Sequence, residues 1–143
     1  MISMKTHLAT ITEMKMLNGE VCLRFNLPLL GAIRPGQFLQ VFDPASENLL
    51  PTLLHPCGSE NNHLFFCGKV PRNWQPGTIM HIRGPRGNGF HLPPMARYIS
   101  LAAFDISSAN RLLPLAKIAL QSGSAVSLLT DSVLTDLPSE IEL

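Results

Sequence analysis

The residues with the clearest chemical potential form a glycine-rich stretch at 84–90, with the sequence Gly-Pro-Arg-Gly-Asn-Gly-Phe. Glycine and proline at this density permit backbone shapes that residues with a Cβ resist. A loop of this kind can bring its N–H groups close to an anion or to a neighbouring strand. The spacing fits neither the dinucleotide-binding fingerprint nor the P-loop, so on its own it favours a tight loop after a strand.

Histidine and cysteine side chains form a second group, at His55, Cys57, His63 and Cys67. These pairs lack the Cys-x-x-Cys spacing that anchors most structural zinc sites. A cysteine nucleophile would need a supporting histidine motif, and the sequence offers none. We therefore expect neither a metal site nor a catalytic residue among them.

Composition narrows the classes of partner. The chain has 143 residues, of which 45% are hydrophobic and only 15% are charged, and its formal net charge is +1 at pH 7. A charge so close to zero gives no reason to expect a nucleic acid or an anionic membrane as partner. A mean hydropathy of +0.18 predicts that some apolar surface meets another protein.

The sequence also bears on the compartment. No apolar run is long enough to span a membrane, and the N-terminal stretch is too short and polar for a signal peptide. Cys22, Cys57 and Cys67 are odd in number and scattered along the sequence, which is typical of free thiols in a reducing compartment. We expect a cytoplasmic protein without membrane insertion.

The elements that would position these residues begin with short strands separated by turns. Alternating or apolar runs predict strands at residues 6–12, 21–27, 37–42, 53–55, 63–67 and 78–83. Asn18-Gly19 is a strong hairpin signal, because both central positions of a type I′ turn need positive φ. Pro35-Gly36 and Pro76-Gly77 mark two further turns. This pattern predicts a small antiparallel six-stranded β-barrel over residues 1–94, in which closure removes the sheet edges.

After Pro94 the pattern changes to that of an α/β fold. Continuous apolar runs at 98–103 and 125–129 are typical of buried parallel strands. Between them one helical face is apolar, formed by Leu112, Leu115, Ala116, Ala119 and Leu120. We expect Pro114 to lie in about the first helical turn, and residues 136–140 to begin a second helix. The fold class is therefore β + α/β, with a truncated parallel βαβ unit over residues 95–143.

The caps of the first helix can be assigned from the same pattern. Ser107, Ser108 and Asn110 are available as N-terminal caps, and Gly123 is a suitable C-terminal stop. The helix is therefore expected to fill most of the connection between the two parallel strands.

Several motifs resemble those of the ferredoxin–NADP reductase superfamily. The stretch 84–90 is similar to the loop that closes its flavin-binding barrel, in the form found in the electron-transfer subunit of dihydroorotate dehydrogenase. Residues 35–38 and Pro76-Gly77 are similar to its turns before the third and sixth strands, and 112–116 to the first helix of its nucleotide domain. The resemblance covers roughly residues 6–140 and implies an electron-transfer oxidoreductase with an FAD-binding barrel.

The resemblance places FAD against two short segments and the glycine loop. The residues implied as cofactor contacts are His55, Pro56, Cys57, Gly58, Gly68, Lys69, Gly84, Gly87, Asn88 and Gly89.

Both short segments depart from the superfamily's pattern. Residues 55–58 read His-Pro-Cys-Gly where it has Arg-Pro-x-Ser, and residues 68–71 read Gly-Lys-Val-Pro where it has Gly-x-Gly-Thr. Histidine is mostly neutral at pH 7 and lacks the arginine fork, and proline has neither an N–H nor a hydroxyl. The resemblance thus implies FAD that is weakly held or lost, although Lys69 and Arg72 could supply charge and Trp74 could stack on a ring.

The nucleotide half departs further. Residues 105–111 stand where the superfamily has a glycine-rich loop, and every glycine is absent while Asp105 adds a negative charge. This implies no useful binding of NAD(P). An iron–sulfur cluster is not expected either, because four thiolates are normally needed and the chain has three cysteines.

Two functions remain open from the sequence. One is an electron-transfer subunit with a weakened FAD site, and the other is a non-catalytic binding or assembly subunit of a redox complex. A parallel sheet with one crossover helix predicts an uncovered apolar face. We expect a homodimer, or a complex with a dehydrogenase-type subunit, that buries Leu101, Val126 and Leu128 or their neighbours.

Overall fold

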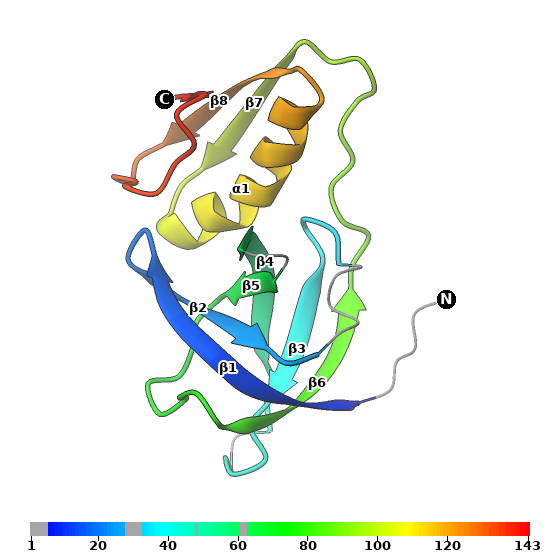
Figure 1. Ribbon diagram of the computed structural model, residues 1–143, viewed down its shortest axis with the longest axis vertical. Coiled ribbons are helices and arrows are strands. Elements are labelled where there is room, and N and C mark those ends of the chain that lie inside the picture. Colours follow the sequence, from blue (N-terminus) through cyan, green and yellow to red (C-terminus); the bar gives the residue numbers. More distant parts are fainter. Residues whose placement is uncertain (1–5, 28–32, 48, 61–62) are drawn as a thin grey trace.

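The computed structural model describes residues 6–27, 33–47, 49–60 and 63–143. Within them, a closed antiparallel barrel is followed by a three-stranded parallel sheet, and helix α1 (Ile106–Gln121) lies between the two (Figure 1). In spatial order the barrel strands are β1 (His7–Leu17), β2 (Glu20–Phe25), β5 (His63–Cys67), β4 (Thr52–Glu60), β3 (Phe38–Phe42) and β6 (Ile79–Arg86). The expected fold class is confirmed.

The barrel follows from local turn chemistry and alternation. Asn18 and Gly19 have φ of 49° and 83°, as a type I′ turn requires, and they join β1 to β2. Inward side chains such as Ile11, Leu39 and Met80 are fully buried in one core. β1 and β4 are longer than the alternation predicts, because their pairing with neighbouring strands extends them past the apolar residues. Trp74 is also buried in this core, so it is not available to stack on a cofactor.

The glycine loop closes the barrel by packing against the turn before β3. A Cβ at Gly36 would meet the ring of Phe90 at 2.9 Å, and φ at Gly36 is +90°. The amide of Gln37 donates to the carbonyl of Gly87 at 2.9 Å, and the N–H of Phe90 donates to Pro35 at 2.8 Å. These close approaches explain why two glycine-containing segments, far apart in the sequence, are both needed here.

The second sheet is ordered β7 (Tyr98–Ala103), β8 (Ala125–Thr130) and β9 (Ile141–Glu142), all parallel. Helix α1 begins earlier than expected, because Asp105 is its N-cap and accepts from the N–H of Ser108 at 2.6 Å. Pro114 therefore lies well inside the helix and not in its first turn. Within the described chain no helix is both long and apolar enough to cross a membrane.

The expected second helix at 136–140 is wrong. These residues form turns, and β9 follows them directly. The physical reason is the strand that follows, since Ile141 pairs with Val126 of β8 and leaves too few residues after Asp136 for a stable helix. The side-chain oxygen of Asn18 accepts from the N–H groups of Thr135 at 2.9 Å and Asp136 at 2.7 Å, which holds the start of this segment at the barrel hairpin.

A buried polar pair, Asn18 and Asn110, joins the barrel to the βαβ segment. Asn18 in the barrel hairpin donates from its amide to the side-chain oxygen of Asn110 in α1 at 2.9 Å. Asn110 is fully buried and donates to the carbonyl of Leu17 at 3.0 Å and to Glu20 at 3.1 Å. Because buried polar groups are costly unless paired, these bonds determine how α1 sits on the barrel.

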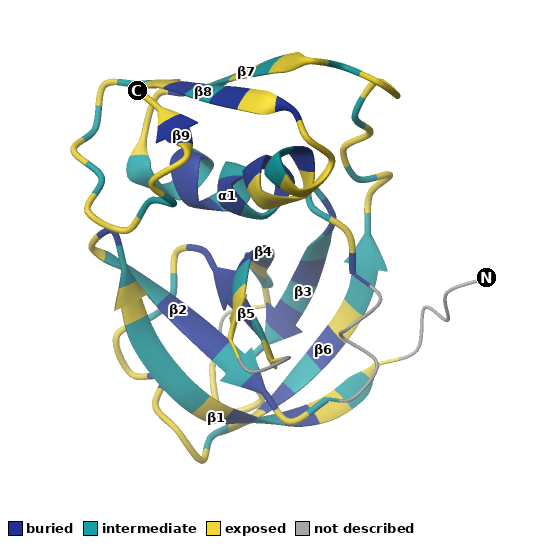
Figure 2. Ribbon diagram, turned by 45° about the horizontal axis from the view of Figure 1, so that its top comes forward, coloured by how far each residue is buried: buried dark blue, intermediate teal, exposed yellow. Residues whose placement is uncertain are grey.

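One face of the parallel sheet packs on α1 and the other faces outward (Figure 2). Val126 and Leu128 are buried with α1, and Leu101 packs against the same cluster. The expectation that these three residues meet a partner is therefore wrong, because they already face the helix. Their neighbours Tyr98 and Leu129 are exposed on the outer face, at 81% and 73%.

Candidate functional site

Strand β4 lies between two cavities. His55 lines a cavity of about 480 Å³, hereafter the Arg111 cavity. Cys57 and Gly58 line another of about 360 Å³, hereafter the Cys57 cavity. The strand reaches both because the register with β5 shifts between Pro56 and Gly58, a β-bulge that redirects the side chains that follow.

The Arg111 cavity is built at the junction between the barrel and the helix. Its walls come from β3, from β4 with the residue before it, from the segment after β5 and from α1. The lining residues are Phe38, Pro51, Thr52, Leu53, His55, Lys69 and Arg111. The cavity thus combines apolar side chains with two cationic ones, a composition suited to a ligand that has both an apolar and an anionic part.

Two polar atoms on this cavity's lining residues are buried and lack a partner. His55 Nδ1 and Arg111 Nε make no hydrogen bond to any described residue. The His55 ring lies against Phe38, with the ring centroids 5.8 Å apart and an interplanar angle of 39°. A third such atom, Arg86 Nε at the end of β6, lines neither of the two cavities. Buried polar groups are normally satisfied, so two orphans on residues that line one cavity make it a candidate place where a ligand or water completes the bonding.

The electrostatics of the Arg111 cavity are set by few groups. Burial and then the nearby Arg111 cation lower the pKa of His55 from 6.5 to about 4, so its imidazole is neutral at pH 7. Asp105 at the start of α1 is exposed, and its pKa is lowered by the Ser108 hydrogen bonds and by the Arg111 and Lys69 cations. Arg111 and Lys69 therefore carry the positive charge of the site, with Asp105 as the competing anion nearby.

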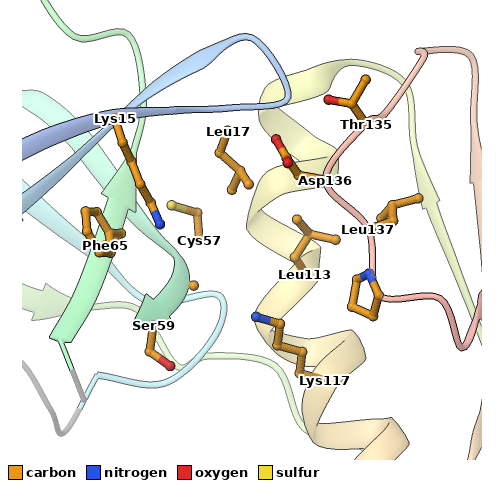
Figure 3. A pocket seen from close by; sticks show the side chains of 12 residues that line it. Lys15, Leu17, Cys57, Ser59, Phe65, Leu113, Lys117, Thr135, Asp136 and Leu137 are labelled. Atoms are coloured by element: carbon orange, nitrogen blue, oxygen red, sulfur yellow. The ribbon is translucent and has the colours of Figure 1, made fainter. Parts of the chain in front are cut away.

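The Cys57 cavity has a different character (Figure 3). Figure 3 shows barrel residues such as Lys15 and Phe65 facing Lys117 of α1 and Leu137 of the segment before β9. Two of its charged groups, Lys15 and Asp136, are paired within the protein. The Lys15 ammonium bonds Glu60 at 2.9 Å and lies 4.0 Å from the centre of the Phe65 ring. The Asp136 carboxylate accepts from the backbone N–H of Asn18 at 3.1 Å.

The three cysteines, scattered in the sequence, lie together beside this cavity. Cys22 pairs with Cys67 between β2 and β5, and the β4 bulge brings Cys57 Sγ to 3.2 Å from Cys22 Sγ. All three are buried and free. Hydrogen bonds to Cys22 and Cys67, followed by burial, raise the pKa of the Cys57 thiol. No group of three or more side chains suited to a metal ion occurs among the described residues.

The residues expected to contact FAD are not gathered in one place. His55 and Lys69 share the Arg111 cavity, while Cys57 and Gly58 line the other one. Pro56 is fully buried, and Gly68 packs tightly against the backbone of Leu53. The loop residues Gly84, Gly87, Asn88 and Gly89 line neither of these two cavities.

Sequence reasoning missed Arg111. The residue lies in the segment 105–111, which was interpreted only as a lost glycine loop. The only signal was compositional, since an arginine is absent at position 55 while another appears in the expected helix.

Comparison with known proteins bears on the fold. No protein-family model and no curated protein sequence matches this chain. Among solved structures, the ferredoxin reductase of carbazole 1,9a-dioxygenase superposes with a TM-score of 0.69 at 17% identity, covering 96% of this chain and 48% of that one. Phthalate dioxygenase reductase gives 0.68 at 17% identity, covering 96% and 50%. The ferredoxin–NADP+ reductase of Plasmodium falciparum gives 0.66 at 16% identity, covering 89% and 60%. The chain has the ferredoxin reductase-like fold and spans about half the length of the first two of these proteins.

Proposed function

We propose that this chain is a ferredoxin reductase-like electron-transfer subunit that holds FAD weakly in the Arg111 cavity. The observation that carries the proposal is the pair of orphaned buried atoms, His55 Nδ1 and Arg111 Nε, beside one cavity of a reductase-like fold. A flavin nucleotide fits this chemistry, because its phosphates accept hydrogen bonds and its ring suits an apolar wall that includes Phe38. When bound, a flavin supplies one- and two-electron transfer, and the protein positions it.

Weak binding follows from what the barrel side offers. His55 is neutral at pH 7 and has no fork, and Pro71 cannot donate a backbone N–H. Each lost charge-assisted contact costs about 1.5–3 kcal/mol, so two lost contacts move a nanomolar site to about the micromolar range. Assignment to the type found in the electron-transfer subunit of dihydroorotate dehydrogenase depends on the glycine loop alone.

We also propose that the start of α1 is not a useful NAD(P) site. The start of α1 is the place where a pyrophosphate would be expected, and the Asp105 carboxylate already accepts from the N–H of Ser108 there. A phosphate at this position would be repelled by the negative charge of the Asp105 carboxylate. No iron–sulfur cluster is proposed, because the thiols form one buried group with a raised pKa at Cys57.

A second candidate function is that of a non-catalytic subunit in a redox complex. It is favoured by exposed large side chains on and beside the parallel sheet: Tyr98 and Leu129 on the outer face are 81% and 73% exposed, and Phe104 directly after β7 is 82% exposed. Exposed large side chains on a sheet face are candidates for a protein interface. We propose a homodimer or a dehydrogenase-type partner for this face, with residues 1–94 as an FAD-binding-like barrel unit and 95–143 as the contact unit.

A visible absorption spectrum separates the two functions. Protein purified from its native host should be yellow, or should take up FAD on titration with a dissociation constant of about micromolar order. Protein that stays colourless and binds no FAD at about 100 µM would favour the second function. Sedimentation of the same preparation tests the partner, and a strictly monomeric species with no co-purifying protein would contradict it.

A further inference from the structure

Arg111 lines the same cavity as His55, the position at which the superfamily's pattern has an arginine. His55 occupies the β4 position and is neutral at pH 7, whereas Arg111 projects from α1 to line the same cavity. The two side chains are close enough for the Arg111 charge to lower the pKa of His55. The cationic side chain at this side of the cavity, Arg111, therefore comes from helix α1 and not from strand β4.

The backbone that carries Arg111 is firmly held. The preceding residue, Asn110, is fully buried and bonds to Asn18 and to the carbonyl of Leu17 in the barrel hairpin. Helix α1 is thus anchored to the barrel one residue before the guanidinium. A cationic group on an anchored element is preorganised for an anion, which lowers the entropic cost of binding.

The guanidinium of Arg111 also has hydrogen-bonding capacity that the protein does not satisfy. Arg111 Nε has no hydrogen-bond partner among the described residues. Asp105 is the nearby anion that interacts with both Arg111 and Lys69, and it is exposed and already bonded to Ser108. Guanidinium groups bind phosphate through paired N–H donors, so an orphaned Nε next to a cavity suits a phosphate better than a neutral ligand.

We infer that Arg111 together with Lys69 is the clamp for the phosphate groups of the bound nucleotide, so that the ligand bridges the barrel and helix α1. This inference rests on the proposed function for the ligand's flavin part, but the clamp itself requires only a pyrophosphate. The cofactor is then held from the α/β segment, and the phosphate contact missing from β4 is supplied across the junction.

Binding of two nucleotides and one flavin without phosphate tests the clamp. FAD, ADP and riboflavin are titrated against the full chain by calorimetry or fluorescence. We expect Arg111→Met to weaken FAD and ADP at least about tenfold, as loss of a charge-assisted phosphate contact requires, and to leave riboflavin unchanged. Arg111→Lys should recover part of the loss. Lys117→Met is the matched control, because Lys117 lies on the same helix but lines the Cys57 cavity.

The outcomes separate the clamp from the proposed function. If Arg111→Met binds FAD and ADP as tightly as the unmodified chain, the clamp is wrong and the flavin site stands. If ADP binds through Arg111 while neither flavin binds, the clamp stands and the proposed function is wrong. If none of the three ligands binds the unmodified chain, both are wrong.

A second variant covers failure of Arg111→Met to fold. Asp105→Asn removes the competing carboxylate, and asparagine remains a good N-cap for α1. We expect it to tighten ADP several-fold, with the gain reduced at high salt because it is electrostatic. Unchanged ADP affinity in Asp105→Asn would overturn the clamp independently of Arg111.

Discussion

The two cavities beside β4 differ in how far their polar groups are satisfied. In the Cys57 cavity, Lys15 bonds Glu60 and Asp136 bonds the backbone of Asn18. In the Arg111 cavity, buried atoms of His55 and Arg111 have no described partner. Both cavities have walls from β4 and α1, but the Cys57 cavity is completed by β1, β5 and residues 135–138, and the Arg111 cavity by β3 and Lys69.

We interpret this difference as one between groups that stabilise the fold and groups that are available to a ligand. Paired polar side chains have already exchanged water for protein partners and contribute to stability. Orphaned ones are a cost to the folded state, and such costs are tolerated at sites of binding. We therefore expect changes near the Cys57 cavity to act on stability and changes in the Arg111 cavity to act on binding.

The largest effect is expected from Asn110→Ala, beside the Cys57 cavity. The change removes the partner of Asn18 and the donor to Leu17, leaving buried groups unsatisfied. The free energy of unfolding should fall by about 2–4 kcal/mol, measured by urea denaturation. Asn88→Ala, in the exposed glycine loop, is the control and should change it by less than about 0.5 kcal/mol. Equal effects of the two changes would contradict the structural role of the Asn18–Asn110 pair.

A smaller effect is expected from acid on His55. The pKa of His55 is lowered from 6.5 to about 4 by burial and by Arg111, so between these values the unfolded chain binds more protons than the folded one. The free energy of unfolding should therefore fall as pH falls from about 6.5 to 4. Because His55 is only half-buried, we expect a loss of about 1–2 kcal/mol and not the full value of the shift.

The His55 contribution can be isolated by difference. His55→Gln keeps a polar side chain that does not titrate, so the pH dependence of unfolding should be shallower in this variant across the same window. Parallel pH profiles for the two proteins would show that His55 is protonated equally in the folded and unfolded states.

A change of opposite sign is expected for Arg111→Met in the absence of ligand. The substitution removes the unpartnered Nε and keeps an unbranched side chain. The free energy of unfolding should rise by about 0.5–1 kcal/mol, since an unsatisfied buried donor is removed. A clear loss of stability would mean that Arg111 is paired in the folded protein, like the groups of the Cys57 cavity.

The smallest effect concerns the thiols. Because the pKa of Cys57 is raised and all three cysteines are buried, thiolate is scarce and alkylation of the folded chain at pH 8 should be slow. All three should react promptly in denaturant. Rapid labelling of Cys57 alone in folded protein would show that the Cys57 cavity admits reagent to a reactive thiol.

Sequence reasoning succeeded where the determinants are local. Asn18-Gly19 predicted its turn because positive φ is a property of those two residues, and the apolar run at 98–103 marked β7 with correct bounds. It failed where a distant partner decides. Residues 136–140 do not form a helix because Ile141 directly after them pairs with Val126 of β8, a pairing that the residues of the segment do not reveal.

The candidate site was predictable only in part for the same reason. His55 and Lys69 were found from a resemblance of short motifs, and they share a cavity. The meeting of Cys22, Cys57 and Cys67 depends on strand register and on a bulge, which residue spacing does not encode. Arg111 depends on how α1 docks, and that orientation is set by Asn110.

The bond between Asn18 and residues 135–136 has a consequence for how the chain acquires its structure. It joins positions separated by 117 and 118 residues, so its formation requires closure of a very long loop. Contacts of such high sequence separation slow folding and form after local ones. During synthesis, the β1–β2 hairpin emerges first and must wait for Thr135 and Asp136 before the oxygen of Asn18 is satisfied. A nascent chain stalled before these residues is therefore expected to expose an open barrel end, where chaperones and proteases have access.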